Sequence, residues 1–539
     1  MLGKRKPQRA LFDVGNVFAL ALDPHCFHGQ LAAAAPRLFS DDAFATFYDD
    51  RLGRPSVPPS QLALLTLLQH EAGCSDAEAV ARSAFDLRWA AVLGRSAGTP
   101  LCAKSTFQLF RAHLVLHDAV RTLFLASLQE AKNAGLLQRG PLKVALDTKP
   151  ILGRGAVEDT FNLLATGIQQ LLSALAPVAR QSPQQYAAAT QLGRYLAPSI
   201  KGSAEIDWSD GGQRNEFLTQ IVMDARRLLR LAGELSAGEA TGPVRDAAQL
   251  LMQLLLQDIQ ENEGENGRPS ATLRVGTAPG RIPSATDPEQ RHGRKSRSQR
   301  FTGYKGAIAV DRESQLIVDA TVLPGNAADA QGALAQVEQV EANTGQKVAE
   351  ALGDCAYGSG ETRQAFVAAG RALVAKTPQE ASNGGFFPKR AFVIDVIGER
   401  VICPAGIGTG QYSVEADGSR QYRFGGACKE CVLRAPCTTA GEGRRIRVHA
   451  QEALLQRARA YQETSAGRGH LRERVVVEHR LARLGQLGMG QARYLGRAKT
   501  RCQLLLLATV ANLRRTWNWV QEQGAERRGS NGRAGAAAA

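Results

Sequence analysis

Three acidic residues carry the chemistry that this sequence suggests first. Asp147 and Asp354 each stand at the end of a short apolar run, and Glu478 follows late in the chain. A carboxylate at the end of a buried strand is held rigidly and faces a crevice, and hard oxygen ligands of this kind suit Mg²⁺ or Mn²⁺. We therefore expect one three-carboxylate metal site, for which two-metal phosphodiester chemistry is the interpretation to test.

A second group of candidate metal ligands consists of Cys403, Cys428, Cys431 and Cys437. Four thiolates that include one tight pair, Cys428 and Cys431, are typical of a closed tetrahedral Zn²⁺ site, which is structural. Four reduced, buried cysteines are the alternative. The Gly-rich surroundings offer little core of their own and so favour zinc, with His449 as a weaker substitute ligand.

The composition bounds the class of protein. A chain of 539 residues is too long for one hydrophobic core, and 66 Lys and Arg against 51 Asp and Glu give a net charge of +15. This balance favours a polyanionic partner such as nucleic acid. Nine cysteines, most of them scattered, do not form a disulfide framework, and we find no secretory signal and no membrane-spanning run. We expect a soluble cytoplasmic protein.

The N-terminal part reads as a helical domain over residues 1–140, for DNA binding or assembly. Helical periodicity is dense from 57 to 137, and Ser75 with Glu78 predicts an N-terminal capping box. Basic residues are spaced among the apolar positions and form either a DNA-binding face or ordinary solvated charge: Arg82, Arg88, Arg95, Lys104 and Arg111.

The region between the first two aspartates begins with a buried strand over 141–147. Residues 148–300 then read as a mostly helical insertion followed by a basic linker. Trp208 packs this insertion or stacks on a base. Residues 261–300 have the composition of a linker or long functional loop. The linker leads into a run of basic residues that would neutralise phosphates: Arg291, Arg294, Lys295, Arg297, Arg300 and Lys305.

The segment around Asp354 predicts an α/β sheet. Residues 307–310 and 316–322 read as a hairpin, a helix over about 327–342 leads to the strand before Asp354, and a helix near 360–370 leads to a strand at 371–376. We assign 141–520 to one catalytic unit, with a cysteine-rich zinc-binding insertion at 377–448. Residues 521–539 are predicted to be a disordered tail.

Six stretches in order resemble the DDE transposases of bacterial insertion sequences, and residues 22–115 resemble the N-terminal domain of that family. The resemblance implies an all-α N-terminal domain and an RNase H-like mixed sheet with flanking helices, interrupted by the helical and cysteine-rich insertions. The matching stretches are 145–151, 291–295, 301–305, 323–329, 353–357 and 474–478.

The resemblance also implies roles for single residues. Asp147, Asp354 and Glu478 would be the catalytic triad and would hold two Mg²⁺ (or Mn²⁺) ions, with Asp147 and Asp354 on adjacent strands and Glu478 on a late helix. Arg474 would contact phosphate. Glu473 is the rival for the third carboxylate. Family members often carry a tyrosine and a lysine where this chain has Leu471 and Gly485, and Arg480 or Arg483 is a candidate to replace these phosphate contacts. We therefore include Arg294, Lys295, Lys305, Arg474 and Arg483 as expected DNA-binding residues, with a surface lysine as the alternative for Lys305.

The expected function is transposition. The enzyme would bind the terminal inverted repeats of its element, cleave the 3′ ends with Mg²⁺ and join them to target DNA, as a homodimer or larger synaptic complex. A catalytically inactive, transposase-derived DNA-binding protein and a metal-dependent DNA nuclease are the alternatives. Retention of all three carboxylates disfavours the inactive protein, because binding alone does not require them.

Overall fold

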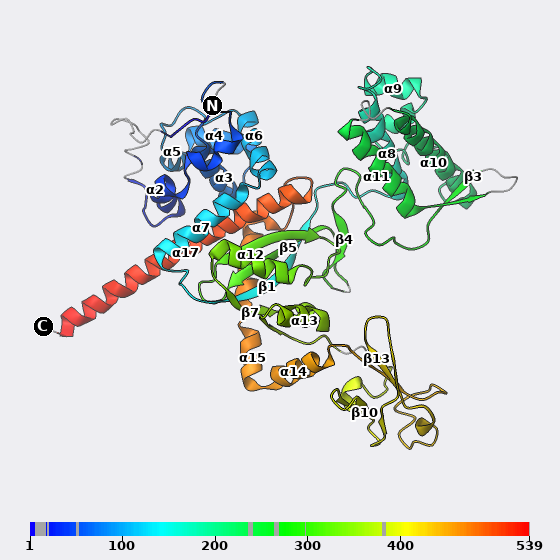
Figure 1. Cartoon of the computed structure of the whole chain (residues 1–539). Helices are drawn as coiled ribbons and strands as arrows, with labels where there is room; N and C mark the ends of the chain where they lie inside the picture. Colours follow the sequence, from blue (N-terminus) through cyan, green and yellow to red (C-terminus); the bar gives the residue numbers. More distant parts are fainter. Residues whose placement is uncertain are drawn as a thin grey trace.

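A six-stranded mixed sheet lies at the centre of the structure, a computed structural model (Figure 1). The structure describes residues 1–5, 18, 21–49, 53–235, 241–263, 269–296, 298–379 and 384–537, without the side chains of 263 and 526–537. The sheet consists of β1 (Leu142–Leu152), β4 (Arg291–Arg294), β5 (Arg300–Asp311), β6 (Ile317–Pro324), β7 (Val348–Gly353) and β8 (Ala372–Ala375).

The strand directions match the sequence-based expectation of an α/β sheet with a parallel component. β5 pairs antiparallel with β1, β4 and β6, so the predicted hairpin of β5 and β6 is confirmed. β7 runs parallel to β1, and β8 runs parallel to β7. The order β6-β5-β1-β7-β8, with β4 also on β5, is consistent with an RNase H-like sheet.

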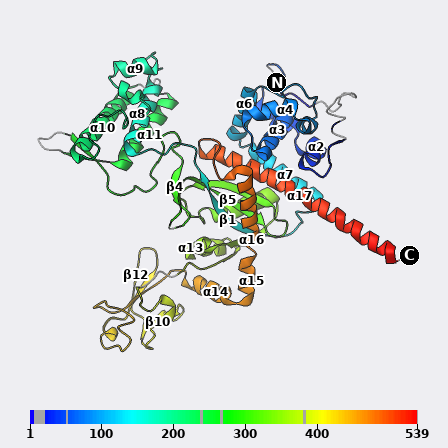
Figure 2. The same cartoon turned by 180° about the vertical axis from the view of Figure 1, so that it is seen from behind.

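Helices cover both faces of this sheet, and β5 is therefore buried from Tyr304 to Asp311. α12 (Ala333–Thr344) packs against β6 and β7, whereas α16 (Val475–Leu484) packs on β1 and α17 (Arg497–Ala537) on β6 (Figures 1 and 2). α12 joins β6 to β7, and α13 (Gly360–Ala368) joins β7 to the parallel strand β8. Parallel neighbours need such a crossover helix, because a tight turn cannot connect them.

The N-terminal helices share their hydrophobic core with the sheet. The apolar run of α17, Leu504 to Leu513, is buried between α7, α3 and β6, so a single core extends from Phe27 to Trp517. The predicted helical segment is confirmed, but its core is continuous with that of the catalytic unit. Its helices are α2 (Phe27–Leu38), α3 (Pro59–Ala72), α4 (Asp76–Phe85), α5 (Leu87–Leu93), α6 (Lys104–Leu116) and α7 (Val120–Ala134).

The basic residues of these helices mostly pair within the domain. Ser75 accepts a hydrogen bond from the Glu78 amide (3.2 Å), as the capping motif predicts, while the Glu78 carboxylate pairs with Arg82. Arg88 and Arg111 pair with acids of the same domain, and Arg95 donates to the Leu101 carbonyl. Four of the five are therefore held by contacts within the domain, Arg111 being buried, and Lys104 is exposed.

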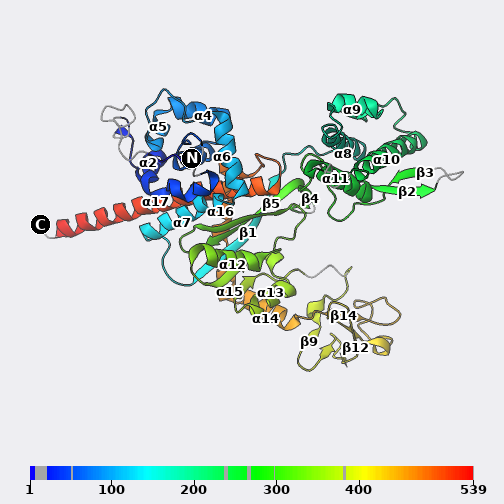
Figure 3. The ribbon, with the colours of Figure 1, turned by 45° about the horizontal axis from the view of Figure 1, so that its top comes forward.

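The helical insertion has a core of its own and lies beside the sheet (Figure 3). Trp208 packs edge-to-face on Phe161, at 5.1 Å between ring centroids, so the packing alternative for this residue holds. The elements are α8 (Thr160–Leu175), α9 (Pro183–Ala189), α10 (Gly211–Gly233), α11 (Gly242–Asp258), β2 (Ile259–Glu263) and β3 (Pro269–Leu273).

The described residues of the expected linker over 261–300 form more regular structure than its composition suggests. It contributes to β2, β3 and β4, and Asp287 and Gln290 are buried. The Tyr304 hydroxyl donates to Asp287 (2.6 Å), and Gln290 donates to the Gly155 carbonyl (3.0 Å). Polar side chains tie this segment to the sheet, which is why hydrophobic periodicity does not reveal it. Arg297 lies outside the described residues.

The cysteine-rich region folds as two three-stranded sheets around a small core. It leaves the main sheet after β8 and returns through α14 (Glu452–Glu463) and α15 (Ser465–Arg472). Its strands are β9 (Val393–Asp395), β10 (Arg400–Ile402), β11 (Gly408–Thr409), β12 (Tyr412–Val414), β13 (Arg420–Arg423) and β14 (Arg445–Val448).

The C-terminal segment differs from the prediction. α17 continues to Ala537, through residues 521–537 that the sequence predicts to be a disordered tail. Extending a helix that is already anchored costs far less than nucleating one, and Ala, Arg, Glu and Gln favour helix. In the described part of the chain, no helix is both long and apolar enough to span a bilayer.

Asn512 on α17 ties this helix to the backbone of β6. Its amide accepts from the Ile317 N–H (2.9 Å) and donates to the Ile317 carbonyl (2.8 Å), at a register shift between β5 and β6. Asn512→Ala should leave both backbone groups unpaired at a cost of about 1–3 kcal/mol each. We expect the thermal unfolding midpoint to fall by several degrees. Asn133→Ala, at an exposed position of α7, is the control, and equal midpoints for the two variants would contradict this role.

Candidate catalytic site

The parallel pairing of β1 and β7 brings Asp147 and Asp354 together. The register pairs Ala145 with Leu352, so Asp147, two residues further along β1, and Asp354, which directly follows β7, lie at the same edge of the sheet. Neighbouring strands are about 4.8 Å apart. The Asp354 carboxylate accepts a hydrogen bond from the Ala356 amide (2.8 Å), which holds it at the carboxyl end of β7.

Glu478 reaches the same place from α16, through Arg474. The Arg474 guanidinium donates to the Asp147 carboxylate (2.9 Å) and also pairs with Glu478, one helical turn further on. The two acids therefore share a single cation. The structure thus places Asp147 beside Asp354 and joins Asp147 to Glu478 through Arg474.

The rival acid, Glu473, faces a different group. Its carboxylate pairs with Arg312, which follows β5 and also pairs with Glu350. Arg312 donates its backbone amide to the Lys143 carbonyl (2.9 Å), at the start of β1, whereas Asp147 lies further along that strand. Glu478, and not Glu473, is the acid of this segment that lies with Asp147.

Burial and like charge perturb the titration of this group. Burial is the largest influence on Asp147, and Asp354 adds to it, so the pKa of Asp147 rises to about 6 although Arg474 and the Thr148 amide act in the opposite direction. Tyr357, fully buried just after Asp354, has a pKa well above its usual range because of burial and the charges of Asp147, Asp329 and Asp354. The Tyr357 hydroxyl has no hydrogen-bond partner among the described residues.

The donor chemistry suits a hard divalent cation, but the side chains are not arranged as a finished site. No three His, Cys, Asp or Glu side chains within the described ranges are placed to hold a metal ion. At the triad, Arg474 lies between Asp147 and Glu478 and supplies the positive charge that a cation would supply. Asp147, Asp354 and Glu478 are the residues that would hold such an ion once Arg474 moves aside.

Asp329 is a fourth carboxylate of the site that sequence reasoning missed. It accepts hydrogen bonds from the Thr148 hydroxyl (2.8 Å) and from the Lys305 ammonium (2.7 Å), and so links β1, β5 and the turn before α12. Lys305 also donates to the Ala327 carbonyl (2.7 Å) and is only 7% exposed. The surface-lysine alternative is therefore wrong. The only signals for Asp329 and Tyr357 were their places in the stretches 323–329 and 353–357.

Lys149 is a third residue of this region that the sequence does not single out. It follows Asp147 by two residues on β1, and alternate residues of a strand share a face. Its ammonium donates to the Leu481 carbonyl of α16 (3.4 Å) and lies 2.8 Å from where a Cβ on Gly485 would stand. Lys149 thus occupies the space in front of Gly485.

The remaining predicted DNA-binding residues lie apart from the triad. Arg294 and Lys295 are exposed at the turn between β4 and β5, beyond the carboxyl end of β1. Arg483 hydrogen bonds to Gln486 (2.9 Å), and burial lowers its pKa, with the charges of Arg514 and Glu71 as further influences. It therefore lies toward the helical domain. Arg480 donates to Gln315 (3.3 Å). Neither arginine takes the position of a triad neighbour.

The four predicted zinc ligands converge without forming a metal site. Cys403, Cys428, Cys431 and Cys437 line one cavity of about 20 Å³, and burial raises the pKa of Cys437, with the other three cysteines adding to the effect. No three of them are arranged as ligands.

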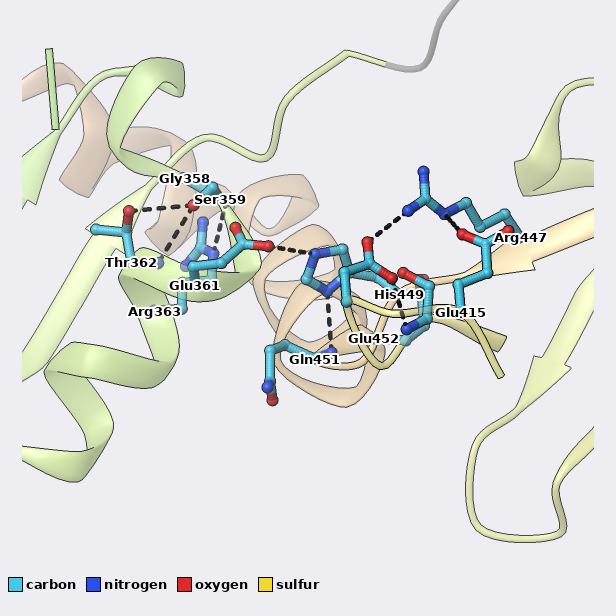
Figure 4. Close-up of polar contacts among 12 residues, drawn as sticks. Gly358, Ser359, Glu361, Thr362, Arg363, Glu415, Arg447, His449, Gln451 and Glu452 are labelled. Carbon is cyan, nitrogen blue, oxygen red and sulfur yellow. Dashed lines mark hydrogen bonds and ion pairs between the residues drawn. The ribbon is translucent and has the colours of Figure 1, made fainter. Parts of the chain in front are cut away.

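His449, the weaker substitute ligand, braces the cysteine-rich region instead (Figure 4). Its Nδ1 accepts from the Gln451 amide (2.9 Å), so Nε2 carries the proton and donates to Glu361 on α13 (2.8 Å). Both ring nitrogens are thus in use.

The raised pKa of Asp147 predicts a pH-dependent stability in metal-free protein. The folded state binds this proton more tightly than the unfolded state, so the stability that it contributes is full below about pH 4 and is lost as the pH rises through about 6. In EDTA, Asp147→Asn should be more stable than the parent at pH 8, by up to about 3 kcal/mol, and the difference should shrink toward pH 4. Thermal midpoints across this range test it, with the exposed Asp246→Asn as control. A difference that does not change with pH would contradict the assignment.

Three segments of the chain match protein families. Residues 271–382 and 402–517 match two families that are each described as a transposase DDE domain, and residues 22–113 match a family described as a transposase domain (DUF772). The first match contains Asp354 and the second contains Glu478, whereas Asp147 lies outside the matched ranges. No curated protein and no solved structure gives a match. The three matches stand in the order expected of one enzyme, and the chain belongs to the DDE transposases of insertion sequences.

Proposed function

We propose that this transposase cleaves DNA at the ends of its element with Mg²⁺ or Mn²⁺ and transfers the 3′ ends to target DNA. The observation that supports this most is the pairing of β1 with β7, which sets Asp147 beside Asp354, together with Arg474, which bridges Asp147 and Glu478. Three carboxylates around one point are costly for folding, because like charges repel and burial penalises them. Bound divalent cations would offset this repulsion, so such an arrangement is expected of a metal-binding site.

In this proposal the three carboxylates would hold two ions, and the chemistry that such ions supply is activation of the attacking water or 3′-hydroxyl and stabilisation of the leaving oxygen. Asp147 and Asp354 are fixed by adjacent strands, so their spacing does not depend on a flexible loop. Glu478 is 50% exposed and lies on a helix, so it is the ligand free to adjust. With ions in place, Arg474 would be free of the carboxylates, and its guanidinium would be available for a phosphate of the bound strand.

Lys149, Lys305 and Asp329 support this edge in different ways. Gly485 has no side chain, and the ammonium of Lys149, on the same strand as Asp147, lies in front of it. Lys149 therefore supplies a positive charge at this place. Lys305 and Asp329 neutralise each other and fix Thr148, the residue next to Asp147. Because Asp329 neutralises its charge, Lys305 would act only through the position of β1, whereas the exposed Arg294 and Lys295 would contact the DNA phosphates directly.

The partners follow from transposition. The enzyme acts in the cytoplasm on terminal inverted repeats and on target DNA, and it works as a homodimer or larger synaptic complex, because two ends must be cut together. An inactive DNA-binding protein would bind the repeats without cleaving them. A plain nuclease would cleave without joining.

We also retain structural Zn²⁺ as a proposal for the cysteine-rich region. Four thiols around one cavity provide the donor set, although the side chains are not placed as ligands. No catalytic role follows for this metal.

The triad predicts a sharp loss of chemistry with retained binding. Asp147→Asn, Asp354→Asn and Glu478→Gln should each reduce cleavage of a labelled element end at least about a hundredfold, because metal coordination contributes several kcal/mol. Gel analysis with Mg²⁺ and a plasmid target separates cleavage from joined product. Asp246→Asn, which changes an exposed acid on α11, should cleave normally. If the three triad variants cleave as the parent does, the site is misassigned.

The zinc proposal predicts about one equivalent of zinc in protein purified under reducing conditions. Cys431→Ser should lose the metal and lower the thermal midpoint, whereas the exposed Cys355→Ser should keep both. Elemental analysis measures the content. If the unsubstituted protein contains no zinc and still folds, these four residues are reduced cysteines and not zinc ligands.

A further inference from the structure

A basic cleft lies between the end of β8 and the corner of α14 and α15. Its volume is about 570 Å³, and Lys376, Thr377, Gln462, Arg468, Leu471 and Arg472 contribute to its lining. Figures 1 and 2 show α14 and α15 between the main sheet and the cysteine-rich region. Below, the basic cleft means the surface formed by Lys376, Arg468 and Arg472.

The cations of the basic cleft are not neutralised by neighbours. All three side chains are exposed, and among the described residues neither Lys376 nor Arg472 pairs with an acid. Arg468 donates to the Glu463 carbonyl, and Glu463 is the one acid in the lining. Other arginines of this region, such as Arg312, Arg459 and Arg474, are held in ion pairs. A concave surface with unpaired cations attracts a polyanion.

The strand register places this cleft at the catalytic edge. β7 pairs with β8 so that Gly353 lies opposite Ala375, and the next residues along are Asp354 and Lys376. The loop after Asp354 packs on this point, since a Cβ at Gly358 would stand 1.8 Å from the Lys376 carbonyl oxygen. From the other side, Arg472 precedes Arg474 by two residues.

The cleft is built from fixed elements. The Thr377 amide donates to the Gln462 side chain (3.1 Å), which ties the exit of β8 to α14. Arg468 and Arg472 are four residues apart on α15, so they project from one face of that helix, and Leu471 forms an apolar wall beside them. Cations on a strand end and a helix keep a constant spacing, as repeated phosphates require.

We propose that the basic cleft binds successive phosphates of the DNA strand whose scissile phosphodiester lies at Asp147, Asp354 and Glu478. This rests on the proposed function, since it assigns the path of that substrate. The strand leaves the triad past Asp354 and runs along Lys376 and the face of α15, toward the cysteine-rich region.

The test is the salt dependence of DNA binding. A fluorescein-labelled duplex that carries the element's terminal repeat and its flank is titrated by anisotropy in EDTA, from 50 to 200 mM NaCl. With Lys376→Glu plus Arg472→Glu, we expect at least tenfold weaker binding at 100 mM salt and a log–log slope smaller by about 2, because each phosphate contact contributes about 0.9. Lys376→Gln plus Arg472→Gln should show the same loss of slope with a smaller loss of affinity.

The control is Arg139→Glu plus Arg180→Glu, two exposed arginines outside the cleft with the same change in net charge. Thermal midpoints verify that all variants fold. If the cleft variant matches this control in both affinity and slope, the cleft is not on the DNA path. The proposed function is then still supported if the parent protein cleaves DNA. If the parent binds no DNA, both proposals fall. A triad variant that binds normally without cleaving separates chemistry from this site.

Discussion

The candidate site depends on one cationic side chain, the Arg474 guanidinium, which is held between acidic side chains. Asp147 is half-buried beside Asp354, and Arg474 joins it to Glu478, so the fold gathers negative charge where water screens it only in part. Arg474 offsets this charge in the absence of metal by pairing with both Asp147 and Glu478. Because Arg474 and Glu478 are one helical turn apart, the packing of α16 on β1 determines whether Glu478 lies near Asp147.

The architecture explains how such distant residues meet. The parallel pair β1 and β7 sets the two aspartates side by side, and α17 joins the sheet to the N-terminal helices in one core. The helical insertion leaves after β1 and the cysteine-rich region leaves after β8, and each has a separate core. Both insertions can thus be accommodated without disturbing the strands that carry the acids.

The sequence predicts where the strands that carry the aspartates end, but not which side chains of other elements contact them. A short apolar run ending in Asp147 or Asp354 is visible along the chain, and the alternation of strands and helices predicts a sheet with parallel neighbours. Asp329, Tyr357 and Lys149 enter the site through tertiary packing, which periodicity does not report. The segment around Asp287 has the polar composition of a linker because hydrogen bonds, not apolar side chains, anchor it, and α17 extends further than its Gly-rich composition suggests.

Iron-directed cleavage of the protein backbone tests most directly whether three distant segments share one metal site. Fe²⁺ replaces Mg²⁺ in the purified protein, and ascorbate with peroxide generates radicals at the bound ion. We predict backbone cuts near residues 147, 354 and 478 together, which excess Mg²⁺ suppresses and Asp354→Asn abolishes. Cuts at only one of these segments, or only within the cysteine-rich region, would contradict a shared three-carboxylate site.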